Sequence, residues 1–265
     1  MKSNLYFETN KSLWNQRTLV HKTSEFYDVE GFKRRKTSLN KVELEELGNV
    51  KDKNLLHLQC HFGMDTLSWA KLGAKTTGID ISDEAIIYAK ELSEELNLKS
   101  DFVCSNVYDL KENLKGTFDI VFTSYGTIGW LPDLNKWADI ISHFLKTNGV
   151  FYIVDFHPIV WMFDNDFKYI QYPYHNAAVI EEELEGTYAD KSAAIKHKSY
   201  GWNHSISEIL NALISKGLTI EHFNEFNYSP YNCFNNTIKG ADGNYRIKGL
   251  ENKIPMLYTI KAIKK

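Results

Sequence analysis

Polar residues stand directly after three strand-like stretches of the sequence. The apolar run over residues 54–59 leads into a turn that ends at Gly63, and Asp80 ends the next such run. An acidic residue about 20 positions after the first turn is typical of a side chain that accepts hydrogen bonds from an adenosine ribose. Asn106 follows a third run and carries the donor and acceptor that pair with an adenine edge. The pattern favours a nucleoside-binding site.

Each of these residues has an alternative interpretation. A lone glycine such as Gly63 is as typical of an ordinary turn as of a close approach to a ligand. Asp80 could cap the following helix, although Ser82 is better placed for that role. Asn106 is also a common turn residue, so both of its roles stay open. The ribose role of Asp80 is the best supported of the three.

Strand-length apolar runs alternate with helix-period segments through the middle of the chain. This alternation is typical of parallel strands joined by crossover helices, and in such sheets the ligand lies beyond the carboxyl ends of the strands. The expected strands are 54–59, 75–80, 102–105, 118–123 and 150–155, and the expected helices are 65–72, 83–96 and 134–145.

The alternation stops after Pro158. We expect an aromatic-rich substrate-side insert, a helix closed by Gly217, and two late strands separated by a turn-rich second insert. The N-terminal segment is expected to form a helical cap, either as a cover over the site or packed on the sheet. All of these parts are assigned to one domain, 1–265, with the cap at 1–50, the inserts at 158–203 and 228–253, the helix at 207–216 and the strands at 219–226 and 254–263.

Five segments of the chain follow one another in a recognisable order: Leu55 to Leu72, Gly78-Ile-Asp80, Asn106-Val107, Phe118-Asp-Ile-Val121 and Gly149 to Asp155. This series resembles the successive motifs of class I S-adenosylmethionine-dependent methyltransferases. The resemblance implies an α/β, Rossmann-like, seven-stranded, mostly parallel sheet with helices on both faces and an antiparallel last strand. It also implies S-adenosyl-L-methionine as the cofactor.

The first motif departs from the usual family pattern of an acidic residue followed by a glycine-rich loop. The phrase Leu-His-Leu-Gln-Cys-His-Phe-Gly keeps only the last glycine, and it resembles a variant branch of the family. Gln59 and His61 are expected to supply polar contacts to the methionine amine or carboxylate. The cofactor-binding residues that the resemblance implies are His57, Gln59, Cys60, His61, Gly63, Thr66, Asp80, Ile81, Asn106, Val107, Ser124 and Tyr125.

A nicotinamide-dependent oxidoreductase is the main enzymatic rival, because its fold has a similar first half. Its pyrophosphate must approach a helix N-terminus through a glycine-rich turn. The side chains of Gln59 and His61 would obstruct that approach. Gln59 and His61, in place of the usual glycines, therefore count more heavily against an oxidoreductase than against a methyltransferase.

Aromatic residues gather after the fourth and fifth expected strands. Aromatic faces suit a cationic sulfonium and flat acceptors, although for any single residue core packing is the competing explanation. We assign Trp14, Trp130, Trp161 and Tyr172 to substrate binding. The wider group expected to line the acceptor site or its cover is Tyr125, Trp130, Phe156, Trp161, Phe163, Tyr169, Tyr172 and Tyr174.

Histidine is the side chain best suited to act as a base near neutral pH, if the acceptor must lose a proton. His157 comes directly after the fifth expected strand and is our candidate catalytic residue. His21, His175 and His204 are further candidates from segments that could fold over the cleft. A structural role is the alternative for each.

Composition restricts the class of protein. A net charge of -3 argues against a broad phosphate-neutralising surface, so a nucleic-acid partner is not expected. Neither a secretory signal nor an apolar span is visible, which predicts a cytoplasmic protein without a membrane association. Cys60, Cys104 and Cys233 are widely spaced, which indicates reduced thiols and no metal site.

These observations lead to one predicted function, methyl transfer from S-adenosyl-L-methionine to a small-molecule acceptor. A protein that keeps the nucleoside site without turnover, a pseudoenzyme or regulatory protein, is the alternative from a different class. The sequence predicts neither the acceptor nor the oligomeric state.

Overall fold

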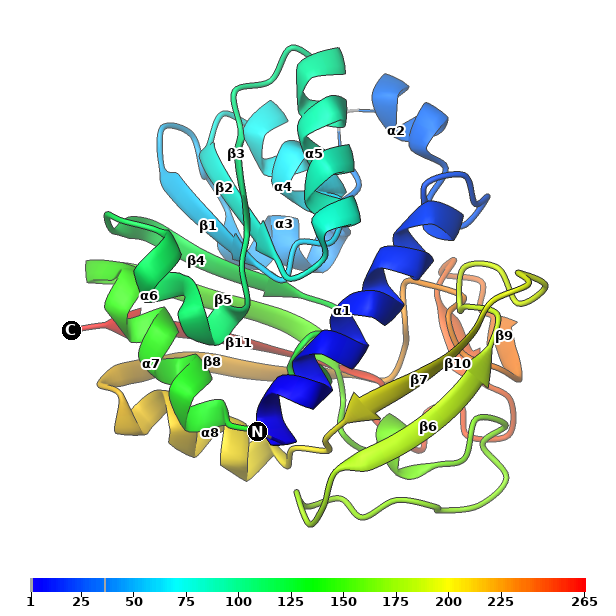
Figure 1. Ribbon diagram of the computed structural model, residues 1–265. Coiled ribbons are helices and arrows are strands. Elements are labelled where there is room, and N and C mark those ends of the chain that lie inside the picture. Colours follow the sequence, from blue (N-terminus) through cyan, green and yellow to red (C-terminus); the bar gives the residue numbers. More distant parts are fainter. Residues whose placement is uncertain (1, 36) are drawn as a thin grey trace.

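Seven strands form the central sheet of the protein, in the order β3-β2-β1-β4-β5-β11-β8 (Figure 1). The computed structural model describes residues 2–35 and 37–265. The first five strands in the chain are mutually parallel, whereas β11 runs antiparallel to both of its neighbours. The strands are β1 (Asn54–Leu58), β2 (Lys75–Asp80), β3 (Asp101–Cys104), β4 (Phe118–Ser124), β5 (Leu145–Phe156), β8 (Leu218–Phe226) and β11 (Leu257–Lys264). The predicted Rossmann-like sheet is confirmed.

The fifth strand differs most from its predicted bounds. β5 begins at Leu145, five positions before the expected start at Val150. The Asn148-Gly149 turn lies within the strand, because residues 146–149 have no partner between the pairs Phe118–Leu145 and Ile120–Val150. Asn148 has a positive φ of 62°, as a turn residue should. The turn was predicted correctly, but the strand continues through it as an irregularity.

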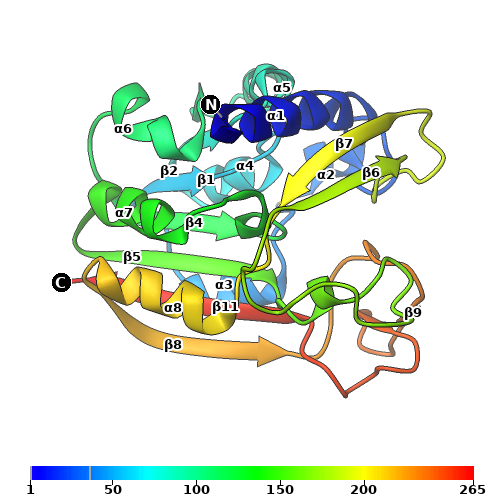
Figure 2. The same cartoon turned by 60° about the horizontal axis from the view of Figure 1, so that its bottom comes forward.

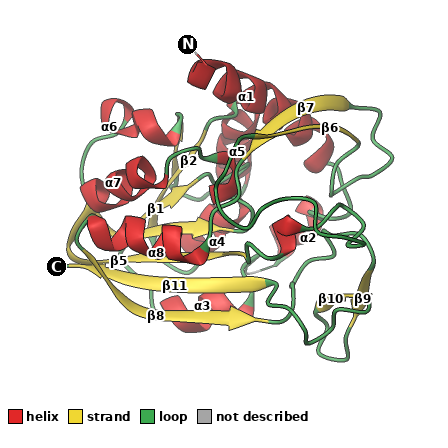
Figure 3. Cartoon of the chain, turned by 90° about the horizontal axis from the view of Figure 1, so that it is seen from below, coloured by secondary structure: helices red, strands yellow, loops and turns green. Residues whose placement is uncertain are grey.

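Helices cover both faces of the sheet, and β1 shows why. Leu56 and Leu58 belong to the core cluster that includes α7 and α8, whereas Leu55 packs with Trp69 of α4 on the other face. Successive side chains of a strand point to opposite faces, so a strand buried on both sides is apolar throughout. Figure 3 shows α7 and α8 on the side opposite α3. The helices of these two layers are α3 (Lys41–Leu47), α4 (Met64–Lys71), α5 (Asp83–Glu95), α7 (Leu134–Phe144) and α8 (Ile206–Ser215).

The long helix α1 (Lys2–His21) lies between α5 and a β-hairpin (Figures 1 and 2). Lys11 forms an ion pair with Asp83 at the start of α5, with Nζ and Oδ2 2.9 Å apart. On the hairpin side, Asn10 donates to the Tyr200 carbonyl at 2.8 Å and accepts from the Tyr200 N–H at 2.9 Å. These contacts hold α1 across the end of the sheet. Two shorter helices are α2 (Val29–Arg34) and α6 (Leu110–Asn113).

The hairpin belongs to the first insert and was not predicted. It consists of β6 (Ile180–Glu185) and β7 (Lys196–Gly201), paired antiparallel. Its first strand reads Ile-Glu-Glu-Glu-Leu-Glu, so the acidic residues obscured the alternation of half-buried and exposed positions. A second short hairpin, β9 (Thr237–Lys239) with β10 (Tyr245–Ile247), lies in the second insert. Over residues 2–35 and 37–265, none of the helices has both the length and the apolar character of a membrane span.

Candidate functional site

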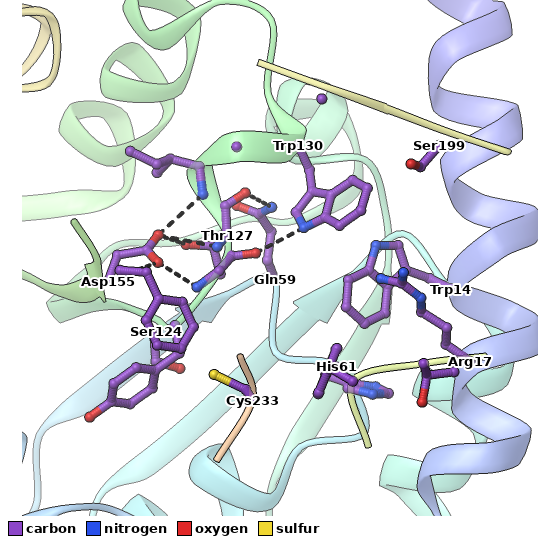
Figure 4. Close-up of a pocket in the computed structure, with 18 of the residues that line it drawn as sticks. Trp14, Arg17, Gln59, His61, Ser124, Thr127, Trp130, Asp155, Ser199 and Cys233 are labelled. Atoms are coloured by element: carbon purple, nitrogen blue, oxygen red, sulfur yellow. Dashed lines mark hydrogen bonds between the residues drawn. The ribbon is translucent and has the colours of Figure 1, made fainter. Parts of the chain in front are cut away.

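A cavity of about 810 Å³ opens at the carboxyl ends of the parallel strands, where α1 and the first insert meet the sheet. Its walls come from α1, from the loops after β1 to β5 and from both inserts. Ligand pockets of small-molecule enzymes fall in a range of roughly 300–1,000 Å³. The site predicted from the sequence is therefore large enough for a nucleoside with an acceptor beside it. Figure 4 shows ten of its residues with labels.

The loop after β1 has an unusual backbone. Gln59, His61 and Gly63 all have positive φ, of 56°, 51° and 80°. Glycine adopts this region without cost, whereas other residues pay roughly 1–2 kcal/mol for it. A Cβ on Gly63 would also lie 2.7 Å from the Phe102 ring. The turn typical of a glycine-rich loop is thus kept, with glutamine and histidine at two of the three left-handed positions.

Gln59 offers a direct test of this backbone. Gln59→Gly and Gln59→Ala both lose the Gln59 side chain, including its 2.9 Å hydrogen bond to the Thr127 carbonyl. Only the glycine relieves the left-handed strain, so it is expected to be more stable than the alanine by about 1–2 kcal/mol in denaturant unfolding. At exposed Lys90 in the middle of α5 the order should reverse, with alanine more stable than glycine by about 1 kcal/mol. Equal stabilities of the two Gln59 variants would contradict the interpretation.

Asp80 ends β2 and lines the cavity, with 8% of its surface exposed. Its Oδ2 accepts the His61 N–H at 2.8 Å, and its Oδ1 accepts the Ser82 N–H at 2.9 Å. Burial raises the pKa of this carboxyl to about 6. Helix α5 is capped by the hydroxyl of Ser82, which accepts the Ala85 N–H. Asp80 is therefore free of the capping role and ties the loop after β1 to the end of β2.

The loops after β2 and β3 supply the neighbouring wall. Ile81, Asn106 and Val107 line the cavity. The Oδ1 atom of Asn106 accepts the Tyr108 N–H at 3.0 Å, which is the turn role that the sequence left open. The side-chain amide group remains available at the cavity wall, and Ile81 and Val107 provide apolar surface beside it.

His57 and Thr66, two residues assigned to the cofactor site, are hydrogen-bonded to each other. His57 lines the cavity, and its Nδ1 lies 2.8 Å from the Thr66 hydroxyl. Thr66, also assigned to the cofactor, is fully buried and does not line the cavity, and it contacts the site through His57. The ring of His57 also lies 3.3 Å from the Ser124 hydroxyl, and burial lowers its pKa to about 3. His57 is therefore neutral near pH 7.

A polar wall that the sequence did not indicate joins the starts of α3 and α4 to the end of β4. Ser38 and Ser124 both donate to the carboxylate of Asp65, at 2.6 and 3.2 Å, and all three residues line the cavity. Burial raises the pKa of Asp65.

Cys60 also lines the cavity, but burial raises the pKa of its thiol well above the usual value, so it is an unreactive packing group.

Tyr125 connects the cavity to a buried carboxylate. Its hydroxyl donates to Glu43 at 2.9 Å, and Asn40 donates to the hydroxyls of Tyr125 and Tyr231 at 3.0 and 2.8 Å. Burial raises the pKa of Glu43 to about 7. Tyr125 and Tyr231 line the cavity, whereas Glu43 and Asn40 stand behind them. The sequence could not have indicated this network, because its members come from three distant segments.

Asp155, near the end of β5, organises the loop that follows β4. It is 1% exposed, and its carboxylate accepts N–H groups of Gly126, Thr127 and Phe156 together with the Thr127 hydroxyl. The bonds from Phe156 and the Thr127 hydroxyl measure 2.6 and 3.0 Å. Burial raises the pKa of Asp155 in spite of these donors. The residue was predicted to lie in a strand but not to shape the site.

Four aromatic residues were assigned to the acceptor, and all four line the cavity. Trp14 and Trp130 meet edge to face with ring centroids 5.4 Å apart, and the Trp130 indole donates to the Gly126 carbonyl at 2.8 Å. Trp161 packs on Phe156 and Tyr172 donates to Glu182 at 2.7 Å. In the wider group, Tyr169 and Tyr174 do not line the cavity, and Tyr169 is an exposed side chain.

The candidate base His157 lies outside the cavity wall. Its Nε2 atom is 2.8 Å from a Glu225 carboxylate oxygen and its Nδ1 accepts the Ile159 N–H at 3.2 Å. It is 2% exposed and does not line the cavity, so the structure does not bring this candidate base to the other predicted site residues. The strand ends as expected, but the following residues turn its ring toward β8.

The other candidate histidines are also engaged or remote. His204 lines the cavity, but its Nε2 lies 2.7 Å from the Leu131 carbonyl and its Nδ1 3.0 Å from Glu208. His175 is exposed and away from the wall. His21 is buried beside His61, with ring nitrogens 2.9 Å apart. Among the described residues, no cluster of three or more His, Cys, Asp or Glu side chains is placed to hold a metal ion.

Known proteins share both the sequence pattern and the architecture. Residues 56–151 match a family model described as a methyltransferase domain. A ubiquinone biosynthesis O-methyltransferase of Xanthomonas euvesicatoria is 27% identical over 133 residues, which cover 49% of this chain and 55% of the relative. The chain thus spans about half the length of the curated relatives it matches.

Two solved structures illustrate the shared fold. An S-adenosylmethionine-dependent methyltransferase from Clostridium acetobutylicum superposes with a TM-score of 0.60 at 15% identity, over 96% of this chain and 98% of that one. A glycopeptide N-methyltransferase in complex with (S)-adenosyl-L-methionine gives a TM-score of 0.55 at 14% identity, over 86% and 88%. The chain therefore has the fold of S-adenosylmethionine-dependent methyltransferases, and its central segment matches a methyltransferase-domain family.

Proposed function

We propose that this protein transfers the methyl group of S-adenosyl-L-methionine to a small-molecule acceptor. One observation carries the proposal: the loop after β1 keeps its three left-handed positions, and its His61 N–H is bound by Asp80 at the end of β2. The family match over 56–151 and the methyltransferase fold of solved structures support the same conclusion. In this proposal the cap 1–50 and the inserts 158–203 and 228–253 are parts of the same domain and complete its cavity.

The residues present fit the proposed cofactor. The Asp80 carboxylate lies at the cavity and accepts hydrogen bonds from hydroxyl groups, as a ribose requires. The Oε1 atom of Gln59 is buried without a hydrogen-bond partner, although Gln59 lines the cavity. A buried acceptor without a donor costs about 1–3 kcal/mol. The ammonium group of the methionine moiety is a donor of the right charge and size to satisfy it.

When bound, the cofactor would supply a methyl group on a sulfonium, which the acceptor's lone pair would displace while the carbon–sulfur electron pair returned to sulfur. The chain's residues bind and align the two reactants, which is the main requirement of such a displacement. Trp14 and Trp130 offer aromatic faces and edges at the cavity wall, and such faces stabilise a cation. Ser124, the last residue of β4, and Tyr125 add a hydroxyl group each to the residues that line the cavity.

Calorimetry with S-adenosyl-L-methionine, S-adenosylhomocysteine and NAD tests this proposal. Both adenosyl ligands are expected to bind the wild-type protein, and NAD is not, because Gln59 and His61 occupy the path of a pyrophosphate. Failure of both adenosyl ligands to bind would overturn the proposal, and tight NAD binding would favour the oxidoreductase. Binding without methylation of any compound in an acceptor panel would favour the pseudoenzyme.

A further inference from the structure

Arg17 on α1 is a buried cation without a counter-ion. It is 6% exposed and lines the cavity, where it projects from α1 on the side facing Trp130 (Figure 4). None of the ion pairs found over residues 2–35 and 37–265 includes Arg17. Its Nε–H is also buried without a hydrogen-bond partner. An unpaired buried charge is strongly unfavourable, so this arrangement indicates a missing anion.

The groups in contact with Arg17 are neutral. Its Nη2 lies 3.2 Å from Nε2 of His197, and burial lowers the pKa of His197 to about 4. The guanidinium carbon lies 5.2 Å from the Trp14 ring centroid, 5.7 Å from that of Trp130 and 6.0 Å from that of Tyr188. Aromatic faces attract the guanidinium by the cation–π interaction but cannot balance its charge. The positive charge is therefore directed at whatever occupies the cavity.

The other two cations at the cavity wall, Arg35 and Lys191, are exposed, so water solvates their charges. Arg35 is paired with Asp28, and Lys191 donates to Asn235 at 2.6 Å. The acid Glu182 lies near enough for its charge to act on Arg17, but it forms no ion pair with the guanidinium, and its carboxylate accepts a hydrogen bond from Tyr172. Among the described residues that line the cavity, Arg17 is therefore the buried cation without a counter-ion, and it matches one negative charge. It suits a carboxylate, which accepts the planar fork of an arginine, better than a doubly charged phosphate.

The position of Arg17 favours the acceptor as the source of this carboxylate. Its contacts are with Trp14, with Trp130 after β4 and with Tyr188 and His197 of the insert. The charge of Arg17 also acts on His61, which the sequence assigned to the methionine end of the cofactor. The residues that suit the nucleoside, Asp80 and Asn106, are not among the contacts of Arg17. Ser124, which donates to Asp65 as Ser38 does, lies across the cavity from Arg17 (Figure 4).

We propose that Arg17 anchors a carboxylate group of the methyl acceptor, so that the protein methylates small carboxylic acids. The identification of this anion as the methyl acceptor rests on the proposed function. The existence of an anion site at Arg17 does not depend on it. Arg17 is then a specificity-determining residue: it binds the acceptor's charge, while Trp14 and Trp130 flank the part that bears the nucleophile.

Calorimetry with paired ligands tests the anion site. The probes are benzoate, phenylacetate and 3-phenylpropionate, each compared with its neutral amide, with and without saturating S-adenosylhomocysteine. In the wild type at least one acid should bind about tenfold or more tightly than its amide, as a charge-assisted pair predicts. Arg17→Gln should remove that preference, and Arg17→Lys should retain part of it. If no acid is preferred in the wild type, or if Arg17→Gln keeps the preference, the inference is wrong.

Two controls show whether a loss of the acid preference comes from the acceptor site, from the overall charge of the protein or from the cofactor site. Arg34→Gln removes an exposed guanidinium from α2 and should leave the acid preference unchanged. S-Adenosyl-L-methionine and 5′-methylthioadenosine, which lacks the amino-acid carboxylate, should bind Arg17→Gln as tightly as they bind the wild type. Selective weakening of S-adenosyl-L-methionine would assign Arg17 to the cofactor and overturn the acceptor role. If neither nucleoside binds the wild type, the proposed function fails, and the acid preference measured without nucleoside still decides the anion site.

Discussion

Asp80→Ala is expected to weaken S-adenosyl-L-methionine binding by about 1–3 kcal/mol, which is roughly a 5- to 150-fold loss of affinity by calorimetry. The alanine removes the proposed acceptor for the ribose hydroxyls. It also frees the His61 and Ser82 N–H groups that the carboxylate binds at 2.8 and 2.9 Å. Asp80→Asn, which keeps the size but not the charge, should show a smaller loss. Unchanged affinity in the alanine variant would refute the ribose role.

The pH dependence provides a second measurement of the same residue. Burial raises the pKa of Asp80 to about 6, so the carboxylate becomes protonated as the pH is lowered through that value. Only the ionised form accepts charge-assisted hydrogen bonds, and cofactor affinity should therefore fall below about pH 6 in the wild type. The same titration of Asp80→Asn should lack this step. A step of equal size in both proteins would assign it to another group, such as Glu43, whose pKa burial raises to about 7.

Asp155→Asn is expected to lower the free energy of unfolding by roughly 3 kcal/mol, measured by denaturant unfolding. Both carboxylate oxygens of Asp155 accept backbone N–H groups. In the asparagine variant the NH₂ group would replace one of these oxygens, so that two hydrogen-bond donors would point at each other. The loop carries Trp130 and the Thr127 carbonyl that holds Gln59, so cofactor affinity should fall as well.

A surface aspartate serves as the control for that substitution. Asp101 at the start of β3 is exposed, and Asp101→Asn is expected to leave both unfolding and cofactor affinity unchanged. If Asp155→Asn were as stable as the wild type, the carboxylate would not be organising the loop. If it lost stability but bound the cofactor normally, the loop would be structural without serving the site.

The first five strands of the sheet could be predicted because local patterns determine them, whereas the seven-stranded arrangement with an antiparallel last strand was implied by the family resemblance. Parallel strands buried on both faces are apolar throughout, and the helices between them repeat at helical spacing, so five strands and the position of Asp80 follow from the residues alone. The hairpin of the first insert could not be predicted in this way, because four glutamates among the six residues of β6 hide its alternation.

The sequence by itself determined the fold class, the edge of the sheet where the cavity lies and the acidic residue at the end of β2. The tertiary structure decided which side chains face that cavity: it turned His157 toward Glu225 and brought Arg17 to a hairpin about 180 positions away in the chain. It also brought the Asp155 carboxylate to the N–H groups of the loop after β4. It gave Gln59 and His61 the positive φ angles that glycine usually adopts. The physical reason is that periodicity reports burial along one element, whereas the pairing of polar groups depends on elements far apart in sequence.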